Sequence, residues 1–313
     1  MSLDFELDRA VRLAAFKWLD MRKAILGNVL PRSILETGFQ FNGIQVPIVG
    51  PQGIFKPKLL PKIPLSITTI PGGPYDDDLR DGSSVIHYRY RGNNVQHHEN
   101  VGVRYALETQ TPLIYCYRVM PGSYVVSYPV FVCGDEPENL TFAIQLDDEV
   151  ALASYATGTS TGLKVQESAI HRHYITTTAK RRIHQVAFRE RVLKAYQTQC
   201  ALCRLRHGAL LDAAHIIPDG EPDGLPEVSN GLSLCKIHHA AYDLNYLGIT
   251  SQYKVEVRQD LLDEVDGPML QHGIKALHGE SLVLPRVQND RPSPVRLEAR
   301  FERYLKAGRP SGE

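Results

Sequence analysis

Apolar positions follow two different periods along this chain. In residues 1–27 they recur at helical spacing, which predicts an amphipathic packing or interface helix with Leu3, Leu7, Ala10, Leu13, Ala14, Trp18 and Met21 on its apolar face. From about 35 to 145, Gly and Pro separate short β-rich runs: IQVPIVG, IPLSITTI, SSVIHYRYRG, TPLIYCYRV and SYVVSYPVFV. Strands at this spacing predict a compact sheet or barrel.

The second half of the chain returns to helical patterning. Residues 151–165, which include TGTSTG, lose strong periodicity and are interpreted as a linker. HQVAFRERVLKAY predicts a helix, and after residue 245 the pattern predicts a strand in YKVEVR, a helix near Leu261–Leu277 and a last helix in VRLEARFERYLK. We therefore expect an α+β protein with an N-terminal helix at 1–30, a β-rich domain at 31–150 and a C-terminal domain at 166–313.

Composition changes this picture only locally. The 313 residues have a formal net charge of zero, so total charge does not indicate a nucleic-acid partner. Residues 163–206, however, are strongly basic. They form either a solvated helix face or a contact with phosphates, for which the candidates are Lys180, Arg181 and Arg182. The N-terminus has no signal-peptide pattern, and no apolar run is long enough to span a bilayer, so we expect a cytoplasmic protein without membrane contact.

Four metal-binding side chains occur as two pairs with matching spacing. Cys200 and Cys203 form a CxxC turn, and Cys235 and His238 form a CxxH turn. A Cys3His set is a common donor set for tetrahedral structural zinc. The alternative is a pair of buried free thiols and an unrelated histidine. If His238 binds zinc, the adjacent His239 is left for another role.

The segment CALC…LDAAHIIP…SNGLSLCKIHHAAYD resembles the zinc-knuckled, McrA-like branch of the HNH endonuclease family over roughly residues 170–250. The resemblance implies a ββα-metal fold. It implies that His215 is the general base, that Asn230 holds the loop and so orients the base, and that His239 is a ligand of a catalytic divalent ion, either Mg²⁺ or Mn²⁺. Asp243 matches a position that supplies a further ligand in some members.

One position departs from the HNH pattern. Many members have a metal-binding Asp or His immediately before the general base, whereas this chain has Ala214. Asp212 lies two residues earlier, on the same face of a strand. Either Asp212 reaches the ion or water fills the vacant position.

The segment Gly72–Val103, GGPYDDDLRDGSSVIHYRYRGNNVQHHENVGV, resembles part of the SRA (SET- and RING-associated) family, and the match extends over about 35–145. Taken alone, the segment is an acidic turn followed by an edge strand. The resemblance implies a β-barrel of the SRA/PUA-like type that flips a modified cytosine out of double-stranded DNA.

The SRA resemblance also implies a base pocket. Tyr75 and Tyr90 would sandwich the base, and Asp78 would accept a hydrogen bond from the cytosine amino group. Because the spacing is a few residues longer than in the family, Asp77 is the alternative to Asp78. Arg91 replaces the usual Thr, which leaves open whether the mark is 5-methylcytosine, 5-hydroxymethylcytosine or another modification.

Together these features predict a type IV, modification-dependent restriction endonuclease, and two active sites for a double-strand break suggest a homodimer. One alternative is an HNH nuclease whose N-terminal domain reads another mark, such as a phosphorothioate, or plain sequence. The other is a catalytically dead, zinc-containing DNA-binding protein.

Overall fold

A computed structural model describes residues 2–71, 85–146, 155–156, 168–265 and 267–307. The chain divides into two compact units, Met1–Val186 and Ala187–Glu313, which are described separately. The division falls within helix α5 (Ser168–Ala195). Of the predicted linker at 151–165, only residues 155–156 belong to the described part of the chain.

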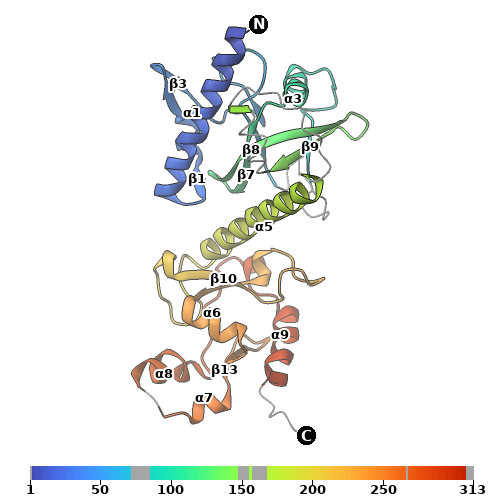
Figure 1. Cartoon of the computed structure of the whole chain (residues 1–313). Coiled ribbons are helices and arrows are strands. Elements are labelled where there is room, and N and C mark those ends of the chain that lie inside the picture. The colour runs from blue at the N-terminus through green and yellow to red at the C-terminus, as the bar shows by residue number, and fades with distance from the viewer. Residues whose placement is uncertain (1, 72–84, 147–154, 157–167, 266, 308–313) are drawn as a thin grey trace. The chain divides into compact units, whose positions relative to one another are not determined.

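The N-terminal unit combines a mixed sheet with helices on its surface (Figure 1). The helices are α1 (Ser2–Leu26), α2 (Arg32–Thr37) and α3 (His98–Thr109). The strands are β1 (Val29–Pro31), β2 (Phe39–Phe41), β3 (Ile44–Val46), β4 (Ile54–Phe55), β5 (Ser66–Thr69), β6 (Ile86–Arg89), β7 (Leu113–Met120), β8 (Ser123–Glu136) and β9 (Thr141–Leu146).

Seven of these strands form one sheet in the order β4-β5-β7-β8-β9-β6, with β1 paired to β8. The β5–β7 pair is parallel and the other pairs are antiparallel. Strand β7 is buried at nearly every position, which is typical of a strand covered on both faces. The sheet curls into a half-barrel, and among the described residues its edges β4 and β6 are not paired with each other. The β-rich region is therefore confirmed as a curled sheet, while its SRA-like character stays a prediction.

Helix α1 is present as predicted, and part of the predicted face is buried: Trp18 is in the core, and Leu7, Leu13 and Ala14 pack against it. Met21 and Ala10 are exposed, whereas Val11, Ala15 and Leu19 are fully buried against the sheet. The buried stripe also contains charged residues, Asp8 and Arg12, and a pattern of apolar residues alone does not reveal them.

Arg12 ties α1 to the rest of the unit. It is fully buried, its Nε lies 2.5 Å from Asp8 Oδ1, and it donates to the backbone carbonyls of Ile63, Pro64 and Pro112 at 2.8–3.2 Å. Removing one partner of a buried ion pair leaves the other charge uncompensated.

We expect Asp8→Ala to lower the free energy of unfolding of the N-terminal unit by about 3 kcal/mol, the lower end of the range for a broken buried pair. Denaturant unfolding measures this change. The matched control is Glu6→Ala, which removes the exposed partner of Arg9 on the same helix and should cost less than about 1 kcal/mol. Equal losses for the two variants would contradict the importance given to the buried pair.

The C-terminal unit places a hairpin and one helix at its centre. Strands β10 (Leu211–His215) and β11 (Gly231–Cys235) pair antiparallel, and α6 (Lys236–Asp243) follows β11 directly. The remaining elements are the hairpin of β12 (Leu247–Ile249) and β13 (Val255–Val257), the helices α7 (Gln259–Asp263), α8 (Pro268–Gly273) and α9 (Pro294–Ala307), and the short 3-10 turns Gly208–Leu210, Val228–Asn230, Lys275–Leu277 and Gln288–Asp290.

The predicted helix near Leu261–Leu277 is wrong as a single element. The structure has α7, α8 and a 3-10 turn in its place. Pro268 explains the break, because its ring disfavours helical conformation at Gly267 and it takes the first position of α8 instead. The predicted strand in YKVEVR and the last helix are confirmed as β13 and α9.

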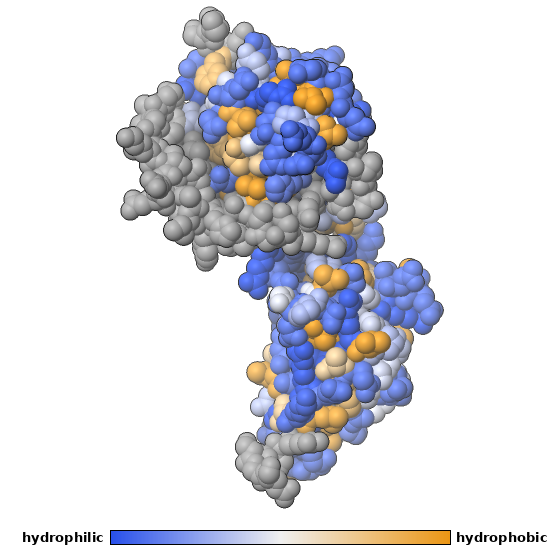
Figure 2. Space-filling view, turned by 90° about the vertical axis from the view of Figure 1, so that its right-hand side faces the viewer, coloured by the Kyte–Doolittle hydropathy of each residue, from blue (hydrophilic) through white to orange (hydrophobic). Residues whose placement is uncertain are grey.

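The described surface mixes polar and apolar residues. Figure 2 shows one face on which hydrophobic residues stand in small groups separated by hydrophilic ones, an ordinary pattern for a protein surface. Within the described parts of the chain, no helix combines the length and apolarity needed to cross a bilayer.

Candidate active site and metal centre

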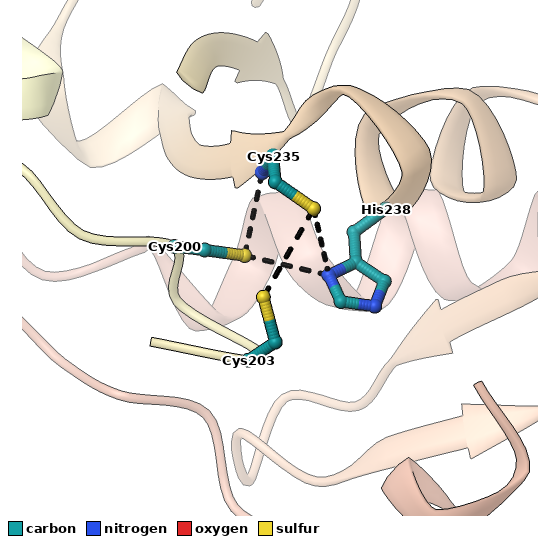
Figure 3. Close-up of side chains that lie close together, drawn as sticks. All are labelled: Cys200, Cys203, Cys235 and His238. Carbon is teal, nitrogen blue, oxygen red and sulfur yellow. Dashed lines mark hydrogen bonds between the residues drawn. The ribbon is translucent and has the colours of Figure 1, made fainter. Parts of the chain in front are cut away.

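The four predicted zinc ligands lie together (Figure 3). Their ligand atoms are all within 4.8 Å of one another. His238 Nδ1 is 3.4 Å from the Cys200 sulfur and 3.2 Å from the Cys235 sulfur, and the sulfurs of Cys203 and Cys235 are 4.0 Å apart. A tetrahedral zinc ion with Zn–S bonds of about 2.3 Å requires sulfurs about 3.8 Å apart. The spacing therefore fits a bound zinc ion.

Hydrogen bonds connect these ligands with one another and with the backbone. His238 is buried, and its Nε2 lies 2.7 Å from the carbonyl of Gly273, to which it donates. This bond fixes the tautomer and leaves the Nδ1 lone pair directed at the sulfurs. The hydrogen bond between the two thiols lowers the pKa of Cys200, where backbone N–H groups act in the same direction, and raises the pKa of Cys235. A lowered pKa favours the thiolate, which is the form that binds metal.

The β10–β11 hairpin places the predicted base at the end away from the cysteines. His215 pairs with Gly231 in the register, and Leu211 pairs with Cys235. The Phe188 ring of α5 stacks on the His215 ring at 4.0 Å and 16°. A Cβ at Gly231 would lie 2.9 Å from that phenylalanine ring, so only glycine leaves enough space for the Phe188 side chain. Burial lowers the pKa of His215, which favours the neutral imidazole that a general base requires.

Asn230 closes the loop that joins the two strands. The residue is fully buried; its side-chain oxygen accepts from the Ile217 N–H at 2.9 Å, and its amide donates to the carbonyls of Ile217 and Leu225 at 3.0 and 3.1 Å. Its backbone carbonyl accepts from the N–H of Ile216 at 2.9 Å. The side chain thus fixes the backbone immediately after His215.

His239 lies between two carboxylates. Its Nε2 is 3.3 Å from Asp243, and its Nδ1 is 3.6 Å from Asp212. Two ligands at adjacent positions of an octahedral ion with bonds of about 2.1 Å are about 3 Å apart. The His239 Nε2–Asp243 pair fits such an ion, and Asp243 is exposed enough to leave positions for water or phosphate oxygens.

Asp212 approaches the other nitrogen of His239 and has cationic partners. It lies 2.5 Å from the Lys236 ammonium and 3.9 Å from Arg189 Nε. Although burial acts in the opposite direction, Lys236 and His239 lower the pKa of Asp212. Asp212 and Asp243 therefore lie near the two different ring nitrogens of His239. Ala214 is fully buried in the core of the unit.

The predicted base-pocket residues of the N-terminal unit are only partly described. Tyr75, Asp77 and Asp78 lie outside the described residues. Arg91 is exposed, and its Nε is 3.8 Å from the carboxylate of Glu99.

Tyr90, in contrast, is 1% exposed, and one face of its ring stacks on Phe142 at 4.4 Å. Its hydroxyl donates to Asp135 and accepts from Arg104, and burial raises the pKa of Tyr90 to about 12. Tyr90 therefore lies in the protein interior, whereas the neighbouring Arg91 lies on the surface.

The predicted phosphate-contacting residues lie on α5. Arg181 and Arg182 are exposed there, and the side chain of Lys180 is outside the described part. The sequence did not indicate Phe188, Arg189, Lys236 or the Gly273 carbonyl as neighbours of the site. Two of them could have been found from the sequence, because Lys236 follows the zinc-ligand candidate Cys235 and Arg189 belongs to the basic run. No sequence feature points to the backbone carbonyl of Gly273.

Comparison with known proteins finds a family match within the C-terminal unit. Residues 200–250 match the family described as HNH endonuclease. The predicted resemblance to HNH endonucleases is therefore confirmed for this segment. A solved structure, the modification-dependent TagI restriction endonuclease, is similar over 77% of this chain and 82% of that chain, with 17% sequence identity and a TM-score of 0.28. A comparison with curated proteins gave no match.

We expect the purified protein to contain one zinc ion per chain and Cys203→Ser to lose it, because the weaker donor opens the tetrahedral set. Metal analysis by mass spectrometry measures the content. Cys133→Ser is the matched control, since Cys133 is an exposed cysteine in the other unit and should keep the zinc. Full zinc content in Cys203→Ser would exclude it as a ligand.

Proposed function

We propose that this protein is a modification-dependent DNA endonuclease. The C-terminal unit hydrolyses a phosphodiester bond, and the N-terminal unit selects double-stranded DNA that contains a modified cytosine. The hydrolytic half is supported by the HNH match and by the charges of His239 and Asp243, which both act on the His215 ring. The selective half rests on the SRA resemblance of residues 35–145.

The side chains of the C-terminal unit have distinct roles in the proposed reaction. His215 takes a proton from the attacking water, and its stacking on Phe188 holds the ring in position. Asn230 fixes the backbone that follows the base. His239 and Asp243 hold a divalent ion, Mg²⁺ or Mn²⁺, which when bound stabilises developing negative charge on the phosphate and the leaving oxygen.

Asp212 orients His239 through Nδ1 in this proposal, rather than binding the ion itself. Zinc in the Cys3His set has a structural role, because all four positions of a tetrahedral ion are filled by protein ligands. Lys180, Arg181 and Arg182 contact the DNA backbone, and the protein acts as a homodimer in which each HNH unit cuts one strand.

One observation favours a second candidate for the selective half. Tyr90 has its ring buried against Phe142 and its hydroxyl bonded to Asp135 and Arg104, so in this conformation it offers no free face for stacking on a base. An N-terminal unit that reads another mark, such as a phosphorothioate, or plain sequence needs no such face.

We expect cleavage only of modified DNA when matched plasmids, unmodified, 5-methylated or 5-hydroxymethylated at cytosine, are incubated with the protein and Mg²⁺ or Mn²⁺. The His215→Ala variant should lose cleavage by about 10² to 10⁴-fold, the usual contribution of a general base, and keep binding in a gel shift.

The outcomes separate the two halves of the proposal. Equal cleavage of all three plasmids would keep the nuclease and contradict the cytosine reader. Undiminished cleavage by His215→Ala would contradict the assignment of the base. Absence of cleavage with every plasmid, combined with binding, would favour the catalytically dead alternative.

A further inference from the structure

Helix α9 has three arginines on one face and lies outside the residues that match the HNH family. Arg296, Arg300 and Arg303 follow one another at spacings of four and three, which places them on one side of an α-helix. The helix itself is fixed by packing: Leu297 is fully buried, and the Tyr304 ring lies so close to Gly248 of β12 that a Cβ there would be 2.6 Å from it. The arginine face therefore has a defined position in the C-terminal unit.

Arg303 and Arg296 bind the loop that joins β10 to β11. Arg303 makes a two-pronged ion pair with Glu221, at 2.8 and 2.6 Å. Arg296 donates to Glu227 and to the hydroxyl of Ser229, both at 3.1 Å. These partners all lie between the proposed base and Asn230. The loop is thus held from inside by the Asn230 side chain and from outside by α9.

Arg300 binds the other half of the site, the end of α6. It is 9% exposed; it donates to the carbonyl of Tyr242 at 2.7 Å and to the side-chain oxygen of Asn245, and its guanidinium lies 4.8 Å from the centre of the Tyr242 ring. A longer contact of 3.4 Å reaches the carbonyl of Asp243. Arg300 therefore fixes the backbone that presents the Asp243 carboxylate.

We propose that α9 is a positioning element of the nuclease site. Arg303 and Arg296 fix the loop that follows His215, and Arg300 fixes the end of α6 at Asp243. Because all three arginines belong to one helix, the helix fixes the distance between the loop and the end of α6. The inference rests on the proposed nuclease function. None of these arginines is a catalytic residue, because each acts through the backbone or side chain of another residue.

The Arg303–Glu221 pair allows a positioning role to be distinguished from a contribution to folding stability, because the pair is partly exposed. Both side chains are 40% exposed, and ion pairs of this kind contribute little to folding. A displacement of about 1 Å in a supporting loop, however, can cost about a hundredfold in rate. Breaking this pair should therefore change the rate far more than the melting temperature.

The first experiment is a charge swap in the full-length protein with the DNA that the wild type cleaves. Glu221→Arg and Arg303→Glu should each lower kcat by at least about tenfold, as loss of a supporting interaction does, with KM and melting temperature nearly unchanged. The double variant should recover to within about threefold of the wild type, because the pair is restored with its charges reversed. Asp260→Arg is the control: it reverses an exposed acid paired with Arg258 in the same unit and should keep full activity.

A second experiment does not depend on cleavage. Mn²⁺ titration followed by electron paramagnetic resonance should show about tenfold weaker binding in Arg300→Gln and intermediate binding in Arg300→Lys, with unchanged zinc content. If the wild type cleaves no DNA, the proposed function fails, and this titration still tests the positioning role.

The inference is overturned by either of two results. One is full activity of both single charge variants together with unchanged Mn²⁺ affinity in a folded Arg300→Gln protein. The other is a loss of activity that the double swap does not restore and that parallels a fall in melting temperature.

Discussion

The arrangement of the C-terminal unit depends on the meeting of two cysteine turns around one metal position. Cys235 is the last residue of β11 and the N-cap of α6, so a cation held there fixes the angle at which the helix leaves the strand. Cys200 and Cys203 attach the turn after α5 to the same point. Structural zinc contributes about 10–16 kcal/mol in small zinc-binding peptides, as much as the whole stability of many domains. We therefore regard the Cys3His set as the anchor of this unit.

The adjacent histidines of α6 acquire different roles from this anchor. Successive residues of a helix point about 100° apart, so His238 turns inward to the sulfurs while His239 turns toward Asp212 and Asp243. The proposed structural ion and the proposed catalytic ion are thus bound by two consecutive residues of one helix. Two residues outside the matched family segment support these histidines by hydrogen bonds. The Gly273 carbonyl accepts from His238, and Arg300 donates to the backbone at the end of α6.

Short-range sequence patterns predicted those parts that short-range physics determines. The CxxC and CxxH spacings predicted the metal position, and apolar periodicity predicted α1, β13 and α9. The same periodicity failed at Pro268, whose backbone constraint breaks a helix that the apolar pattern continues.

Long-range contacts were not predictable in this way. Nothing in the local sequence indicates that Arg12 is buried against carbonyls more than fifty residues away, or that Arg303 meets Glu221. Tyr90 illustrates the converse case, because a family motif suggested a stacking platform, whereas Phe142, Arg104 and Asp135 surround the side chain.

The most direct test of the anchoring role is hydrogen exchange of the backbone amides before and after zinc is removed with a chelator. We expect the amides of β10 and β11 to lose protection when zinc is absent, because the hairpin and α6 are joined at Cys235. Strands β7 and β8 of the N-terminal unit should keep theirs and serve as the internal reference. Unchanged protection in β10 and β11 after complete zinc removal would contradict the claim that the metal holds the frame of the nuclease site.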